Sequence, residues 1–127
     1  MTAEDNSIYP SHILTIAKNT QHLGRLNGPD ASSYVKGPCG DEMEFYLIIN
    51  NNMIEEVKFY TNGCVATLVC GETTADLVEG KTLDEALAIS PKQVKDKLPG
   101  LPLDHSHCSI LAVTTLFRAI ADYLLKP

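Results

Sequence analysis

Two segments of alternating hydrophobic residues, separated by three asparagines, constrain the fold of this chain most strongly. In the first segment every second position is hydrophobic: Met43, Phe45, Leu47 and Ile49. The alternation returns from about Ile54 to Tyr60, with Val57 and Phe59 on the hydrophobic side. A period of two predicts strands with one buried face, and asparagine tolerates the positive φ of a tight turn. We therefore predict a β-hairpin over 43–60.

The predicted hairpin also brings distant side chains together. Cys39 and Asp41 lie just before its first strand, and Cys64 lies just after its second strand. Because a hairpin places the open ends of its two strands side by side, Cys39 and Cys64 should be neighbours although they are far apart in sequence.

The rest of the chain has mainly helical signals. The predicted helices are a short one after Pro10 that stops by Gly24, one over 65–79, two that begin at the capping motifs 82–85 and 90–93, and a last one from His107 or Cys108 to Leu125. Residues 26–36 contain Gly, Pro, Asp and two serines, and we interpret them as a loop. These elements predict the α+β class, with a small antiparallel sheet and helices packed on one face.

Composition limits the classes of function. A length of 127 residues predicts a single domain over 1–127, with residues 1–8 as a flexible polar tail. The net charge is −6 and there is no basic stripe, which argues against nucleic-acid binding. No apolar run approaches the roughly 20 residues that span a bilayer, and the first residues lack signal-peptide features. We therefore expect no membrane association and a cytoplasmic location, where cysteines stay reduced.

Three cysteines are the candidate functional residues. Cys39, Cys64 and Cys108 lie at the edges of predicted elements, with Asp41 near the first and His107 beside the last. Thiolates gathered with a carboxylate and an imidazole can hold iron–sulfur clusters or zinc. Cys64 precedes one predicted helix and Cys108 starts another, so the helix N-termini should lower the pKa of both thiols.

Each of these residues also has a structural interpretation. A lone cysteine in such a domain is commonly a small buried hydrophobe, and this is the interpretation we favour for Cys70, which shares a helical stripe with Val69 and Leu77. Asp41 could be a turn former, and His107 could be an exposed surface residue. His105 could also reach the site, and we rank it below Asp41 and His107 as a ligand.

Four segments in order resemble the IscU/NifU-type iron–sulfur cluster assembly scaffold family (NifU N-terminal domain). They are Gly-Pro-Cys-Gly-Asp at 37–41, Tyr-Thr-Asn-Gly-Cys at 60–64, Gly-Lys-Thr-Leu-Asp-Glu-Ala at 80–86 and His-Cys-Ser-Ile-Leu-Ala at 107–112. The resemblance extends from about Tyr9 to Tyr123 and implies the family's α+β fold. It also implies a scaffold and carrier, not an enzyme, that assembles a [2Fe–2S] cluster and transfers it to apo iron–sulfur proteins.

The resemblance implies roles for five residues. Cys39, Cys64 and Cys108 would bind the metal, with Asp41 or His107 as the competing fourth ligand. Cys108 is the preferred candidate for the acceptor of persulfide sulfur from a cysteine desulfurase, and a ferredoxin-like protein would donate electrons. The cluster would be held by a monomer or by a cluster-linked homodimer.

Two departures from the family and two rival functions stay open. The family often has Leu-Pro-Pro-Val-Lys for an Hsp70-type chaperone, whereas this chain has Leu-Pro-Leu-Asp-His at 101–105, which counts against chaperone-assisted release. The family usually has serine where this chain has Cys70. One rival is a zinc-bound sulfur acceptor that partners a cysteine desulfurase, although no insertion typical of that branch separates Cys64 from Cys108. The other is an interaction module with structural Zn²⁺.

Overall fold

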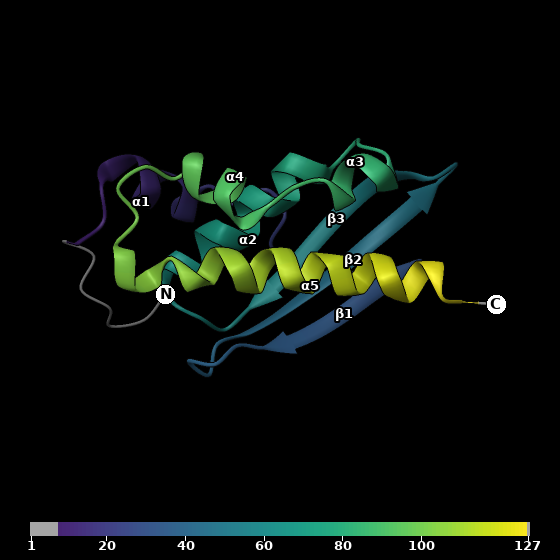
Figure 1. The fold of residues 1–127 in the computed structure, drawn as a ribbon, viewed down its shortest axis with the longest axis horizontal. Helices are drawn as coiled ribbons and strands as arrows, with labels where there is room; N and C mark the ends of the chain where they lie inside the picture. The colour runs from purple at the N-terminus through teal and green to yellow at the C-terminus, as the bar shows by residue number, and fades with distance from the viewer. Residues whose placement is uncertain (1–7, 127) are drawn as a thin grey trace.

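A computed structural model describes residues 8–126, so the predicted tail at 1–8 lies almost wholly outside the described residues. The elements in chain order are α1 Ser11–Lys18, β1 Ala31–Lys36, β2 Glu42–Asn50, β3 Met53–Thr61, α2 Val65–Val78, α3 Leu83–Leu87, α4 Pro91–Asp96, the 3-10 turn η2 Leu103–His105 and α5 His107–Leu124 (Figure 1). Within this range no helix is both long and apolar enough to cross a membrane.

The predicted hairpin is confirmed. β2 and β3 pair antiparallel, and Met43 lies opposite Thr61 at the open end. The turn places Asn51 at φ 54° and Asn52 at φ 60°, the left-handed conformations that a two-residue hairpin turn requires. The predicted α+β class is also confirmed, because the three strands form one antiparallel sheet in the order β1-β2-β3 beside the helices.

The interpretation of 26–36 as a loop was wrong for its second half, which forms the edge strand β1. The sequence there is mostly polar, and among its side chains only Ala31 is fully buried. Antiparallel pairing with β2 creates this strand, since the register runs from Ala31 opposite Leu47 to Lys36 opposite Glu42. Helix α5 supports it further, because the Ser33 hydroxyl donates to the Thr115 carbonyl at 2.6 Å.

Helices α2 and α5 pack on one face of the sheet, with α2 over β3 and α5 over β1 and β2 (Figure 1). The alternating hydrophobic side chains of β2 and β3 fill this interface. Helix α2 approaches β3 so closely that a Cβ on Gly71 would lie 2.5 Å from Cε2 of Phe59. Helix α2 is buried along almost its whole length, whereas the sequence predicted a single buried stripe that includes Val69, Cys70 and Leu77.

An ion cluster joins the segment after α1 to α2; in it His22 and Glu72 are buried and Glu79 is exposed. His22 Nδ1 lies 2.7 Å from Glu72 Oε2, and its Nε2 lies 3.0 Å from Glu79 Oε1. Since both ring nitrogens face carboxylates, only the doubly protonated imidazolium can donate to both. Burial lowers the pKa of His22, but the hydrogen bonds and charges of Glu72 and Glu79 outweigh burial and raise this pKa above its ordinary value of 6.5.

This cluster predicts a pH-dependent stability. The stabilisation from charged His22 should be complete below about pH 6.5, the unfolded value, and should be lost as the pH rises through the raised folded pKa. His22→Gln should lower the free energy of unfolding by about 1–3 kcal/mol at pH 6 and by less at pH 9. Urea denaturation of both proteins across this range measures the difference, and a difference that does not change with pH would contradict the assignment.

Candidate metal and thiol site

The loop between β1 and β2 carries Cys39 and Asp41. Gly37 N–H donates to the Asp41 carbonyl at 2.7 Å, and Gly40 N–H donates back to the Gly37 carbonyl at 3.0 Å. Gly40 has φ 94°, a conformation that favours glycine. This tight loop leaves the Cys39 thiol exposed at the end of the sheet.

Cys64 occupies the N-cap of α2, immediately after β3, and its thiol is partly buried. The glycine before it is required by the packing. A Cβ on Gly63 would lie 2.8 Å from both Asp41 Oδ2 and the Thr67 side chain. Glycine at this position therefore lets the Cys39–Asp41 loop close against the start of α2.

The third segment enters the site through η2 and the first turn of α5. His107 is the first residue of α5 and Cys108 the second. The η2 turn, closed by the His105 N–H donating to the Pro102 carbonyl at 2.9 Å, places His105 beside them. Cys108 is 1% exposed, whereas His105 and His107 are only partly buried.

The structure brings all three predicted thiols into one region. The ligand atoms of Cys64, His105 and Cys108 all lie within 4.8 Å of one another. Cys39 lies at the edge of this group, with its Sγ 3.2 Å from His107 Nε2. The same imidazole nitrogen is 3.8 Å from Cys108 Sγ, so His107 links the exposed thiol to the buried one.

Thr67 connects the remaining predicted ligand, Asp41, to the thiols. Its hydroxyl donates to Asp41 Oδ2 and lies 3.4 Å from Cys108 Sγ and 3.7 Å from Cys64 Sγ. The sequence analysis missed this residue. Its position three residues after Cys64 in a predicted helix was the available signal, since side chains at that spacing share a helix face.

The two inner thiols titrate as a pair with opposite shifts. The Cys108 thiol donates a hydrogen bond to Cys64 and so lowers the pKa of Cys64, although burial opposes this; hydrogen bonds from Thr67 and from the Ala66 backbone lower it further. The pKa of Cys108 is raised, because its proton is shared with Cys64 and because the thiol is buried. The prediction that the helix N-terminus lowers the pKa of Cys108 was therefore wrong. For Cys64 the predicted direction is confirmed, but its largest cause is the Cys108 thiol, and the backbone N–H groups at the start of α2 contribute less.

Cys70 behaves as predicted and does not join the site. Its side chain is fully buried within α2. Burial, with a smaller contribution from the charge of Cys64, raises the pKa of Cys70 to about 12. A protonated thiol of this kind is a small hydrophobic core residue rather than a metal ligand.

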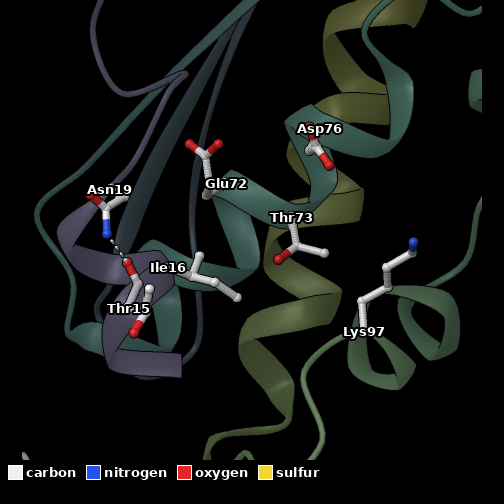
Figure 2. A pocket seen from close by; sticks show the side chains of 7 residues that line it. All are labelled: Thr15, Ile16, Asn19, Glu72, Thr73, Asp76 and Lys97. Carbon is white, nitrogen blue, oxygen red and sulfur yellow. Dashed lines mark hydrogen bonds between the residues drawn. The ribbon is translucent and has the colours of Figure 1, made fainter. Parts of the chain in front are cut away.

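A cavity elsewhere has no matching chemistry. It measures about 340 Å³ and lies between α1, α2 and Lys97 (Figure 2). Neither cysteine nor histidine lines it. Its most buried carboxylate, on Glu72, already accepts hydrogen bonds from the Gln21 and His22 backbones and from the His22 ring. The thiol region is therefore the better candidate for function.

Comparison with known proteins identifies the family. The sequence profile of the NifU-like N-terminal domain family matches residues 8–127, a span that contains every thiol and imidazole of the site. The chain belongs to this family. The match covers all the described residues, in agreement with the resemblance from about Tyr9 to Tyr123.

Curated relatives and a solved structure agree with this assignment. An iron–sulfur cluster assembly scaffold protein IscU from Archaeoglobus fulgidus is 37% identical over 120 residues, which covers 94% of this chain and 78% of that protein. The IscU scaffold of Escherichia coli is 34% identical, covering 93% and 95% respectively. The N-terminal part of a NifU-like protein from Brucella abortus superposes with a TM-score of 0.74 at 20% identity, covering 96% and 98%. The curated relatives are named as scaffolds, in agreement with the expected non-enzymatic class.

Proposed function

We propose that this NifU-like chain is a scaffold on which an iron–sulfur cluster of the [2Fe–2S] type is assembled and from which it is transferred. The observation that carries the proposal is the convergence of Cys39, Cys64 and Cys108, which come from three separate segments, on one end of the sheet. The scaffold names of the curated relatives support it. Thiolates are the usual ligands of such clusters, and the cluster is here the cargo of the protein.

The three thiols differ in solvent exposure, and this difference favours different roles for them. Cys39 is exposed and can meet a partner directly, whereas Cys108 is buried and contacts Thr67. We keep Cys108 as the proposed acceptor of persulfide sulfur from a cysteine desulfurase. Cys108 would pass its proton to the neighbouring Cys64 thiolate, and the Cys108 thiolate so formed would attack the outer sulfur of the donor persulfide and release the donor thiolate. This step requires the first turn of α5 to move, since the thiol is 1% exposed.

Anaerobic reconstitution tests the function. The apo-protein is incubated with Fe²⁺ and sulfide, and the product is examined by visible absorption and Mössbauer spectroscopy. Charge-transfer absorption with paired iron supports a scaffold. A colourless protein that retains Zn²⁺ instead supports a zinc-bound sulfur acceptor, and unfolding of the chain by a chelator, measured by circular dichroism, supports a structural-zinc module.

Asp41→Ala should prolong the life of the reconstituted cluster. The Asp41 carboxylate lies close to the thiols through its hydrogen bond with the Thr67 hydroxyl, and an oxygen ligand holds iron less well than a thiolate does. The resemblance to the scaffold family, in which the matching aspartate affects cluster stability and release, implies that its removal slows cluster loss, and we expect a change of about 10-fold, the size found for residues beside a metal site. The decay of visible absorption in air or with a chelator measures this rate. Faster decay in the variant than in the wild type would show that Asp41 stabilises the cluster.

The expected partners follow from the proposed function. A cysteine desulfurase would supply sulfur, a ferredoxin-like protein would supply electrons, and apo iron–sulfur proteins would receive the cluster. Chaperone-assisted release remains disfavoured by the Leu-Pro-Leu-Asp-His sequence at 101–105. The cytoplasmic location, the oligomeric state and the identity of the fourth cluster ligand stay predictions.

A further inference from the structure

The candidate ligands at the site divide into an inner triad and an outer pair. The inner triad is Cys64, His105 and Cys108, whose ligand atoms lie within 4.8 Å of one another. Cys39 and His107 lie outside that group and form the outer pair, 3.2 Å apart. The two groups meet where His107 Nε2 lies 3.8 Å from Cys108 Sγ.

The inner triad has nearly the dimensions of a metal site. With metal–sulfur distances of about 2.3 Å and metal–nitrogen distances of about 2.1 Å, neighbouring ligands of a tetrahedral ion are about 3.6 Å apart. Cys64 Sγ lies 3.9 Å from His105 Nδ1, so a movement of only about 0.3 Å would complete this edge. The outer pair, in contrast, has the shorter separation of a hydrogen bond between Cys39 and His107.

His105 is held in place from two sides. Its backbone N–H donates to the Pro102 carbonyl within the η2 turn. Its ring packs against Tyr9, with ring centroids 6.1 Å apart, and Tyr9 is only 5% exposed. Asp41, a competing ligand, already accepts a hydrogen bond from Thr67. Among the imidazoles and carboxylates at the site, His105 is therefore the one oriented toward both inner thiols.

We propose that Cys64, His105 and Cys108 form a site for one divalent first-row transition ion, such as Fe²⁺ or Zn²⁺. This site takes up the first metal ion before Cys39 and His107 participate. The order of events rests on the proposed scaffold function, whereas ion binding by the inner triad does not. Both sulfurs bind the ion as thiolates, so the proton that Cys108 shares with Cys64 is released to solvent when the ion binds. Three protein ligands leave a tetrahedral ion one open position, where a further ligand can enter.

Anaerobic titration of the apo-protein with Co²⁺ tests the inner triad. Thiolate-to-cobalt absorption reports bound sulfur, and competition with a chelator gives the dissociation constant. His105→Gln should weaken binding by about 100-fold or more, because removal of a mere hydrogen-bonding partner of a ligand already costs about 10- to 100-fold. The matched variant His107→Gln should weaken binding by no more than about 10-fold, since His107 Nε2 lies 3.8 Å from Cys108 Sγ and is a long hydrogen-bonding partner of a ligand rather than a ligand itself.

The cysteine variants and a second method complete the test. Cys64→Ser and Cys108→Ser should each lose thiolate-to-cobalt absorption, whereas Cys39→Ser should keep it. X-ray absorption of the wild-type protein loaded with one equivalent of Zn²⁺ should find two sulfur ligands and an imidazole. This measurement decides the question even if a variant fails to fold, which circular dichroism of each apo-protein will reveal.

Two results would overturn the inner triad. One is loss of binding in His107→Gln with retention in His105→Gln, which would make His107 the imidazole ligand. The other is three sulfur ligands around Zn²⁺, which would place Cys39 in the same site.

Iron and sulfide reconstitution of the same samples separates the proposed scaffold function from the proposed ion site. An intact two-sulfur ion site without any cluster refutes the scaffold function alone, and a cluster formed on a protein with either overturning result refutes the inner triad alone.

Discussion

Cys39→Ala, Cys64→Ala and Cys108→Ala should each abolish a stable cluster in reconstitution. Each substitution removes one thiolate from a site that has no spare sulfur nearby, because the fourth cysteine, Cys70, is buried within α2. Weaker oxygen or nitrogen ligands cannot replace a thiolate on iron at equal strength. Visible absorption and bound iron per chain, both measured after gel filtration, should fall to the level of a sample without sulfide.

Cys70→Ala is the matched control for this series, since it also removes one sulfur. It should assemble the cluster nearly as well as the wild type, at a cost of about 1–2 kcal/mol in the free energy of unfolding for the small cavity left behind. Loss of the cluster in this variant would make Cys70 an alternative ligand. Retention of the cluster in any of the other three variants would remove that cysteine from the site.

Phe59→Ala should cause a large loss of stability in the apo-protein. Phe59 is fully buried, and it packs against Phe45 with ring centroids 6.0 Å apart and against the backbone of α2 at Gly71. Removing the ring leaves a cavity that the closely packed helix cannot fill, at a cost of about 3–5 kcal/mol. Total stabilities are about 5–15 kcal/mol, so urea denaturation should show a much lower midpoint.

The neighbouring position on the same strand provides the control. Tyr60 is 37% exposed on the opposite face of the sheet, where its ring lies 3.9 Å from the Arg25 guanidinium. Tyr60→Ala should cost about 1 kcal/mol or less, the value of an exposed cation–π contact. Equal losses in the two variants would mean that the hydrophobic face of β3 is not the centre of the core.

Local signals in the sequence were sufficient to predict the hairpin, which brings the loop with Asp41 against the start of α2 at Gly63 and Thr67. The alternation in β2 and β3 and the paired asparagines act over a few residues, so no knowledge of the tertiary structure was needed. The same holds for α3 and α4, whose predicted capping boxes at Thr82 and Ser90 are both present. The short edge strand β1 escaped prediction because its pairing partner, rather than its own polar residues, determines its conformation.

The fine structure of the site depended on contacts that the sequence does not encode locally. His105 was ranked below His107, yet the η2 turn and the packing of Tyr9 bring its ring to Cys64. The raised pKa of Cys108 also arises from a contact across the fold, because the thiol shares its proton with Cys64. The prediction for Cys108 failed because the hydrogen bond with Cys64 and burial change its pKa more than the start of α5 does.

Helix α5 extends from the thiol site to the opposite side of the molecule (Figure 1). It begins at the thiols with His107 and ends at Leu124 (Figure 1), and its 18 residues correspond to roughly 27 Å at 1.5 Å per residue. A fluorophore or surface linker placed beyond Leu124 would therefore stay far from incoming proteins. Immobilisation through that end should present the thiols outward in a uniform orientation, which suits single-molecule observation of metal delivery.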